Sequence, residues 1–257
     1  MKVKDITAAL ERFAPLSIQE GWDNSGLAIG SPEDEVHGVL FGFDCTPALI
    51  DEAIERGCDL VVTHHPLIFK GLKRIQSGDP VSDAVIRAVR GGVAVYAAHT
   101  TADKVIAGVS GAMARRLGLL DVAIMEDEGG YGLGAVGTLP HPMSGEEALA
   151  FVKERFGLQV IRSSRPIDCI GKVAVCGGSG ASEIDAARAS GAQLYISGDI
   201  SYHHFFTPDG FMVMDIGHFE SEVEIVGILC NVIREKFPTF ASYISGNLGR
   251  SNPVRYY

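Results

Sequence analysis

The amino-acid sequence predicts an α/β protein made of two similar lobes in which strands alternate with helices. Apolar runs at 38–43, 60–62 and 92–98 are separated by helical patterns, which is typical of βαβ units on a parallel sheet. After Cys169 the same order of elements begins again, which indicates an internal structural repeat. Histidines and acidic residues follow several of the apolar runs directly, so the ends of the strands are the place to look for function.

The composition limits the class of protein. A chain of 257 residues can bury a large core as one elaborate domain or as two packed lobes. The formal net charge is −10 and Lys and Arg form no cluster, which argues against binding nucleic acid through its phosphates. A small anion could still bind locally.

The cysteines and the apolar runs predict the compartment. Five widely spaced cysteines without a C-x-x-C motif indicate reduced, mostly buried thiols: Cys45, Cys58, Cys169, Cys176 and Cys230. The N-terminus runs straight into an amphipathic pattern, and no apolar run is long enough to span a bilayer. We therefore expect a cytoplasmic protein without membrane association.

Residues 1–125 form the predicted N-terminal α/β lobe. A helix from Ile6 to Phe13 begins it, and the glycine-bracketed loop at 19–30 holds the only tryptophan, Trp22, for which we expect a packing role. The rest alternates strand and helix, with strands at 38–44, 60–62 and 92–98 and helices that start at Thr46-Pro47 and near Ser82.

Residues 126–168 form a predicted small α+β middle segment, and 169–257 a C-terminal α/β lobe that completes the site. In the middle, Ser144 and Glu147 form a capping box, 158–161 is an expected strand, and His141 lies in an expected solvent-exposed turn. The C-terminal lobe has three expected strands, at 172–176, 193–197 and 211–215. The glycine-rich turn 177–180 could cradle a phosphate, but a plain tight turn is the better interpretation.

Two adjacent histidines, His64 and His65, end the strand at 60–62 and are followed by Pro66. Successive side chains of a strand point to opposite faces, so the two imidazoles can converge only if the backbone turns there. Further on, His99 and Asp103, and likewise His218 and Glu222, stand four residues apart where a strand passes into a helix. Each pair can point an imidazole and a carboxylate at one place.

These six side chains form a plausible set of metal ligands. Neutral imidazole with carboxylate suits zinc, manganese, iron, cobalt or nickel and is a poor match for calcium. Six ligands suit two ions better than one, and two ions bridged by a carboxylate and a water or hydroxide form a common hydrolytic centre. The competing interpretation is that some of the histidines cap helices or orient the ligands.

Five motifs in this order resemble the NIF3-like family, whose bacterial members carry the label GTP cyclohydrolase 1 type 2 homologue. The motifs are Trp22-Asp23-Asn24-Ser25-Gly26-Leu27, Thr63-His64-His65-Pro66, His99-Thr100-Thr101-Ala102-Asp103, Ser197-Gly198-Asp199 and Gly217-His218-Phe219-Glu220-Ser221-Glu222. The resemblance covers nearly the whole chain. One departure is Thr101-Ala102, where the family usually has Asn-Leu.

The resemblance implies a NIF3-like fold with a dinuclear metal centre between the lobes, and a toroidal homohexamer. The implied ligands are His64, His65, Asp103, His218 and Glu222, with Asp103 or Glu222 as the bridge and His99 outside the ligand set. The segment 126–168 is too short for the PII-like domain of longer members, so the chain resembles the compact form.

The leading functional prediction is a dinuclear metal-dependent hydrolase acting on a nucleotide-like or other small substrate. A bridging hydroxide would attack the substrate while His99, His203 or His204 transfers protons. The alternative is a non-enzymatic metal-binding hexamer that serves as a scaffold or interacts with a regulator. A third interpretation, metal storage or delivery, predicts exchangeable metal and no turnover.

Overall fold

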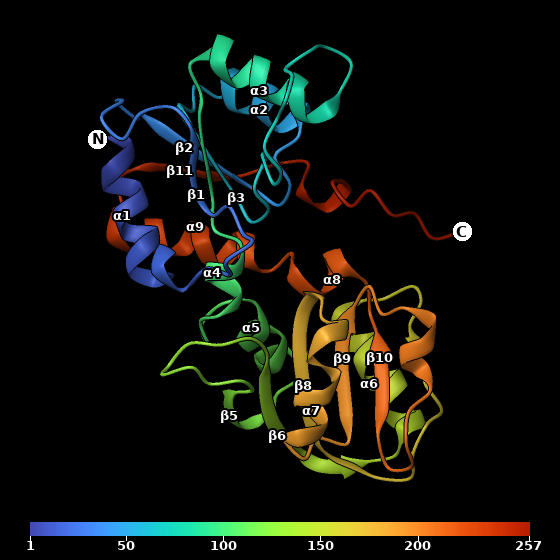
Figure 1. Cartoon of the computed structure of the whole chain (residues 1–257). Helices are drawn as coiled ribbons and strands as arrows, with labels where there is room; N and C mark the ends of the chain where they lie inside the picture. The colour runs from blue at the N-terminus through green and yellow to red at the C-terminus, as the bar shows by residue number, and fades with distance from the viewer. The chain divides into compact units, whose positions relative to one another are not determined.

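A computed structural model describes all residues, 1–257, and divides the chain into two compact units (Figure 1). Unit 1 consists of 1–102 and 225–253, and unit 2 of 103–224 and 254–257. These units do not coincide with the expected segments 1–125, 126–168 and 169–257. The difference arises because the chain returns to the first sheet after residue 224, where its last strand pairs with a strand near the N-terminus.

Unit 1 contains a five-stranded sheet with the order β1-β4-β3-β2-β11. Its strands are β1 (Gly26–Ile29), β2 (Gly38–Gly42), β3 (Leu60–Thr63), β4 (Ala94–Ala97) and β11 (Ala241–Ile244). The pairs β11–β2, β2–β3 and β3–β4 are parallel, and β1 is antiparallel to β4. The predicted parallel βαβ units are therefore present, with one antiparallel edge strand.

Helices cover both faces of this sheet (Figure 1). They are α1 (Val3–Phe13), α2 (Pro47–Glu55), α3 (Pro80–Gly91) and α9 (Ile225–Lys236), with short 3₁₀ turns η1 (Leu16–Ile18) and η4 (Leu248–Arg250). Thr46 caps α2 by accepting a hydrogen bond from Leu49 N at 3.2 Å, and Pro47 occupies the first turn, where a missing N–H costs nothing. Strand alternation directs Leu40, Val61 and Val95 into one core with α2 and α3.

Unit 2 contains a six-stranded sheet with the order β5-β6-β8-β9-β10-β7. Its strands are β5 (Leu120–Ile124), β6 (Ala135–Met143), β7 (Arg162–Ser163), β8 (Ile170–Ser179), β9 (Leu194–Gly198) and β10 (Met212–Asp215). The helices α5 (Val109–Arg116) and α6 (Gly145–Phe156) contribute to one core, and α7 (Ile184–Ala189) contributes to a second core. The remaining elements are α8 (His218–Glu222), η2 (Ala181–Glu183) and η3 (Tyr202–Phe205).

The two sheets share a repeated arrangement. The strands β8, β9 and β10 are parallel neighbours, as are β2, β3 and β4. In each triplet the last strand also pairs with an antiparallel edge strand, which is β1 on β4 and β7 on β10. The predicted fold of two similar α/β lobes is confirmed.

The expected middle segment 126–168 is an integral part of the second sheet, because β6 pairs with both β5 and β8. The capping box at Ser144 is confirmed, with Ser144 Oγ accepting from Glu147 N at 3.3 Å. The expected strand at 158–161 is wrong, since the chain pairs only at Arg162–Ser163. His141 is exposed, as expected, but it lies within β6 and not in a turn.

Helix α4 (Thr100–Asp103) begins in unit 1 and ends at the first residue of unit 2. His99 immediately precedes it and Asp103 is its last residue. None of the helices is both long enough and apolar enough to cross a bilayer.

Candidate metal centre

His64 and His65 follow β3, whose four residues are all buried. The backbone turns sharply at this point, since the N–H groups of both histidines donate to the same acceptor, Phe43 O, each at 3.2 Å. Thr63 Oγ1 donates to His65 O at 2.8 Å and closes the turn. This turn lets two adjacent imidazoles point to one place, which an extended strand would prevent.

His99 joins these two histidines in unit 1. One nitrogen of each imidazole lies within 4.8 Å of a nitrogen of the other two, a spacing at which three side chains can share a metal ion. The ring centroids are 4.9 Å apart for His64 and His65, and 5.3 Å from each of them to His99. The ring of Phe43 stacks on His64 at 5.7 Å and restricts its rotation.

The hydrogen bond made by His64 defines its tautomer. Its Nδ1 lies 2.9 Å from Ala98 O. A carbonyl oxygen can only accept, so Nδ1 carries the proton and Nε2 carries the lone pair of the neutral imidazole. A histidine that binds a metal typically has its other nitrogen held in this way.

His65 is held by a carboxylate. Its Nδ1 donates to Asp44 Oδ1 at 2.7 Å, and Asp44 lies two residues after the end of β2. The carboxylate fixes the ring orientation and makes Nε2 more basic, which strengthens a bond to a metal.

His99 is held in the same way by Asp23, with Nδ1 to Oδ1 at 2.7 Å. The Asp23 side chain is fully buried and also accepts from Thr100 N, Thr100 Oγ1 and Ser25 Oγ. Burial by itself would raise the pKa of Asp23, but the hydrogen bonds from His99, Thr100 and Ser25 outweigh it and lower the pKa well below its ordinary range. Asp23 therefore stays ionised and opposes rotation of the His99 ring.

Unit 2 supplies a second group of possible ligands, at the end of β10. Gly217, at φ +93°, turns the chain so that His218 begins α8 and Glu222 ends it. His218 Nε2 and Glu222 Oε2 lie 3.1 Å apart, as the four-residue spacing predicts. Carboxylate oxygens of Glu222 and Asp103 lie within 4.8 Å of each other. Glu222 thus lies close both to an imidazole, His218, and to a second carboxylate, Asp103, of this unit.

His218 also has an orienting carboxylate. Its Nδ1 donates to Asp199 Oδ2 at 2.8 Å. Asp199 follows β9 and has φ +51°, a left-handed conformation that aspartate adopts more readily than most residues. All four histidines therefore direct Nδ1 at an oxygen acceptor and present Nε2 on the other side.

The glycines of the expected turn 177–180 have a specific role. Strand β8 continues through Ser179, and Gly178 has φ +60°. A Cβ atom at Gly178 would collide with Glu222 Oε1, whereas one at Gly177 would collide first with Val109 Cγ1 and press only lightly on Glu222 Cγ. The carboxylate of Glu222 therefore occupies the space beside Gly178, and the side chain of Val109 occupies the space beside Gly177.

Cys176, on β8, is buried near the same carboxylates. Burial raises the pKa of its thiol, and the charges of Asp103, Glu183 and Glu222 raise it further. No cysteine belongs to the converging groups of possible ligands, which consist of imidazoles and carboxylates.

The two other histidines chosen from the sequence lie elsewhere. His203 and His204 are exposed on η3, where His204 Nδ1 is 2.8 Å from Ser201 Oγ and His203 stacks on Phe206. Neither belongs to a converging group of possible ligands. The sequence analysis did not assign an orienting role to Asp44 or Asp199, although each follows a strand that ends near the histidines.

The fold and the site define an α/β protein with histidine and carboxylate groups that could hold a metal ion at the carboxyl ends of its parallel strands. The family model described as Duf34/NIF3 (NGG1p interacting factor 3) matches residues 1–246. The chain belongs to this family, which confirms the resemblance inferred from its motifs.

Relatives and solved structures agree with this assignment. The chain is 35% identical over 229 residues to a GTP cyclohydrolase 1 type 2 homolog of Clostridium acetobutylicum, covering 86% of this chain and 85% of the relative. It is 32% identical over 252 residues to a protein of the same name from Clostridium perfringens, covering 95% of both.

Among solved structures, the Staphylococcus aureus hypothetical protein SA1388 superposes with a TM-score of 0.92 at 26% identity, covering 100% of this chain and 99% of that one. Reduced HcgD from Methanocaldococcus jannaschii superposes with a TM-score of 0.81 at 27% identity, covering 95% and 97%. The similarity therefore extends through nearly the whole fold.

Proposed function

We propose that this protein is a metal-dependent hydrolase that holds two divalent transition-metal ions per chain through His64, His65, Asp103, His218 and Glu222. The observation that carries the proposal is the shared orientation of the histidines. Each of His64, His65 and His218 has Nδ1 bound to an oxygen acceptor, so that the neutral ring offers Nε2 to a metal.

The donor types fit such ions. Imidazole nitrogen with carboxylate oxygen suits zinc, iron, manganese, cobalt or nickel, and no cysteine belongs to the converging groups. Asp103 and Glu222 would add two neighbouring carboxylates, whose oxygens lie within 4.8 Å of each other, to the imidazole donors.

A bound metal pair would supply Lewis acidity, which lowers the pKa of water and polarises a substrate. The chain itself positions the ligands and moves the proton. Asp44 and Asp199 hold the rings of His65 and His218 in place, and Asp23 does the same for His99. We assign proton transfer to Nε2 of His99, since its Nδ1 is occupied by an ionised carboxylate.

His203 and His204 remain predicted proton carriers on η3. Replacing both with alanine tests this role: a selective loss of kcat with unchanged metal content supports it, and unchanged kinetics contradicts it.

The relatives' names suggest the substrate class. Proteins named GTP cyclohydrolase 1 type 2 homolog share about a third of their residues with this chain. We propose a nucleotide-like substrate of small size, opened or cleaved by addition of water.

The experiment is an activity screen of the metal-loaded protein with nucleotides, phosphoesters and amides. We expect hydrolysis that disappears on chelation and in the double variant His64→Ala, His65→Ala, while the matched control His141→Ala keeps its activity because His141 is exposed on β6. Activity that survives the double variant would contradict the proposal.

The family description, with its reference to an interacting factor, favours a second candidate: a metal-binding scaffold without turnover. In that case the ligand variants lower the melting temperature of the loaded protein, and no substrate is consumed.

The predicted toroidal homohexamer is tested by light scattering, which gives six chains per particle if the proposal holds. Five free cysteines, four of them buried, support the predicted cytoplasmic location.

A further inference from the structure

The two side chains beside His99 are large, aromatic and exposed to solvent. Trp22 is 60% exposed and Phe69 is 45% exposed, so the expected packing role of Trp22 is wrong. Their ring centroids are 5.9 Å apart at an interplanar angle of 60°, and they lie 6.0 and 6.1 Å from the centroid of His99. In an edge-to-face pair the edge of one ring meets one face of the other, so each ring keeps at least one face that its partner does not cover.

The backbone beneath this aromatic pair is held firmly. Asp23, next to Trp22, has a fully buried side chain that accepts from His99, Thr100 and Ser25. Asn24 Nδ2 donates to Ile68 O at 2.6 Å and ties the loop of Trp22 to the loop of Phe69. Because the backbone under the exposed indole is already fixed, the loop does not have to become ordered when a partner stacks on the ring. Binding therefore costs little conformational entropy.

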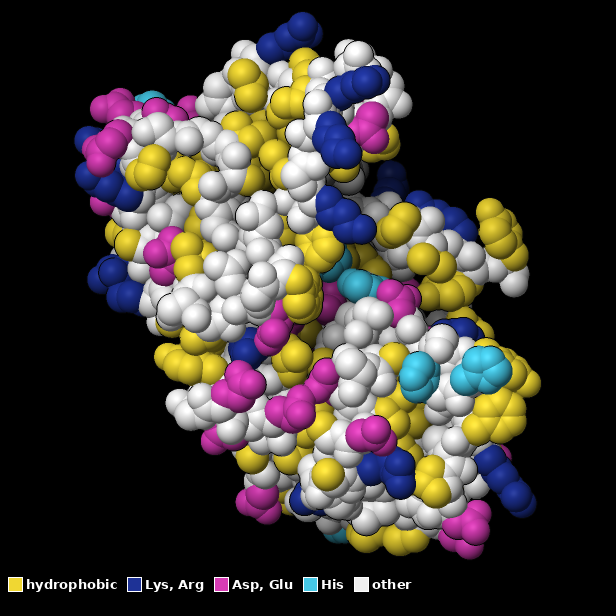
Figure 2. All heavy atoms as spheres, viewed as in Figure 1, with side chains coloured by type: hydrophobic (Ala, Val, Ile, Leu, Met, Phe, Trp, Pro, Cys, Tyr) yellow, Lys and Arg dark blue, Asp and Glu magenta, His cyan; other side chains and the backbone are white.

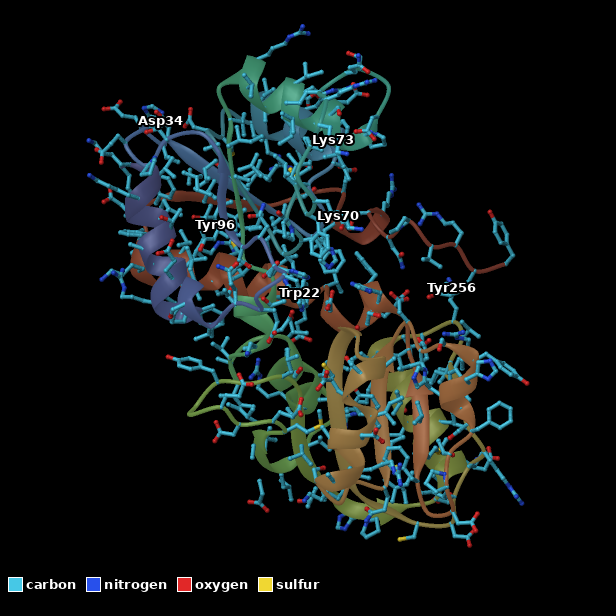
Figure 3. All side chains as sticks on the ribbon, in the orientation of Figure 1. Trp22, Asp34, Lys70, Lys73, Tyr96 and Tyr256 are labelled. Carbon is cyan, nitrogen blue, oxygen red and sulfur yellow. The ribbon has the colours of Figure 1, made fainter.

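Positive charge lies on the same loop as Phe69. Lys70, Lys73 and Arg74 are exposed, and none of them takes part in an ion pair. In Figure 3, Lys70 lies above Trp22, and Lys73 lies above Lys70. Figure 2 shows Lys and Arg side chains beside hydrophobic ones on this face of unit 1. These three cations within five residues are a local basic cluster, contrary to the expectation that the chain has none, and they favour an anion even though the net charge is −10.

We propose that Trp22 and Phe69 form a stacking subsite for the planar heteroaromatic ring of an anionic substrate, with Lys70 and Lys73 attracting its phosphate. This inference rests on the proposed function and specifies which part of the nucleotide the chain grips. The ring contacts with His99 place the stacked ring next to the histidines of unit 1. The charges decide against an apolar peptide as the occupant, because a lysine-rich rim would not complement it.

The first test uses the chain's single tryptophan as a reporter. Metal-loaded protein is titrated with guanosine monophosphate, guanosine or ribose 5-phosphate while Trp22 fluorescence is followed. We expect saturable quenching by the monophosphate, weaker binding of guanosine, and no quenching by ribose 5-phosphate, which lacks the ring. Absence of quenching by the monophosphate, or equal quenching by ribose 5-phosphate, would overturn the proposal.

Variants then test the residues by calorimetry. Removing one aromatic partner of a stacked base weakens binding by roughly 5- to 100-fold, so Trp22→Ala and Phe69→Ala should raise the Kd for the monophosphate by that factor. Trp22→Phe should keep most of the affinity. The matched control is Tyr243→Ala, an exposed aromatic residue on β11 of the same unit, which should leave the Kd unchanged.

The lysines give a separate prediction. Lys70→Gln with Lys73→Gln should weaken binding of the monophosphate and leave guanosine unaffected, and added salt should reproduce the loss. A Kd unchanged in Trp22→Ala, together with a change in oligomer mass, would show that a second copy of the chain covers these rings and would overturn the proposal.

Binding is measured here without turnover, so the two proposals fail separately. Ring binding without hydrolysis contradicts the proposed hydrolase and supports the subsite. Hydrolysis that is insensitive to Trp22→Ala in both KM and kcat contradicts the subsite alone.

Discussion

Replacing Asp44 with alanine removes the carboxylate that holds His65. The change deletes one charge-assisted hydrogen bond of 2.7 Å and leaves the imidazole of His65 in place as a potential ligand. Loss of such an orienting carboxylate typically lowers metal affinity by about 10- to 100-fold, which corresponds to about 1.4–2.7 kcal/mol of binding free energy.

The effect on folding should be much smaller. The side chain of His65 is 22% exposed and that of Asp44 is 36% exposed, so water screens the pair. Pairs of this kind contribute about 0–1 kcal/mol to stability. We therefore expect Asp44→Ala to separate metal affinity from the free energy of unfolding.

The assay is competition for zinc against a chromophoric chelator, with thermal denaturation of the metal-free protein in parallel. The matched control is Asp59→Ala, since Asp59 binds His37 Nδ1 at 3.1 Å and neither residue belongs to a group of converging ligands. Zinc binding by Asp44→Ala as tight as that of the unaltered protein, or an equal loss of affinity in Asp59→Ala, would contradict an orienting role for Asp44.

Gly178→Ala should lower metal affinity because the added Cβ displaces Glu222, whereas Gly210→Ala, at φ +78° with open space around it, should lower only the melting temperature. Burial raises the pKa of Glu52, but hydrogen bonds from Ser245 and Gly246 and the charge of Arg56 outweigh burial and lower the pKa. The ionised carboxylate therefore stabilises the fold at pH values above its unfolded-state pKa of about 4.3. This contribution is lost as the pH falls through the pKa of the folded state. The stability difference between the unaltered protein and Glu52→Gln, measured by urea denaturation, should accordingly shrink from pH 6 to pH 3, and a constant difference would contradict it. Burial and the charge of Asp44 raise the pKa of Cys45 to about 12, and Cys169 is the only exposed cysteine. Mass spectrometry should therefore find one rapidly alkylated thiol in the native protein and five after denaturation.

Local patterns in the sequence were sufficient for the strands and their ends. Apolar runs flanked by glycine and proline place β2, β3, β4, β8, β9 and β10, and the histidines after β3 and β10 lie where parallel strands deliver functional residues. The four-residue spacing of His218 and Glu222 also predicts their proximity, because that spacing returns a helix to the same face.

Long-range pairing could not be predicted in the same way. β11 pairs with β2 across about two hundred residues of chain, and nothing in its four residues specifies that partner. The orienting carboxylates share this difficulty. Asp44 and Asp199 stand at strand ends like many turn residues, and only the three-dimensional arrangement reveals that each faces an imidazole.

Trp22 shows a different limit. A lone tryptophan is usually buried because its apolar area is large, and that expectation is sound for most proteins. Here its neighbour Asp23 is the buried residue, held by hydrogen bonds to His99, Thr100 and Ser25, and the indole is left outside. Composition carries no information about which of two adjacent residues faces the core.

The most direct test of the proposed dinuclear centre is the metal content of protein purified without chelator, compared with the double variant His64→Ala, His65→Ala. We expect close to two transition-metal ions per chain by elemental analysis, and a clear loss of metal in the double variant, which should stay folded. Absence of bound metal, or an unchanged amount in the double variant, would contradict it.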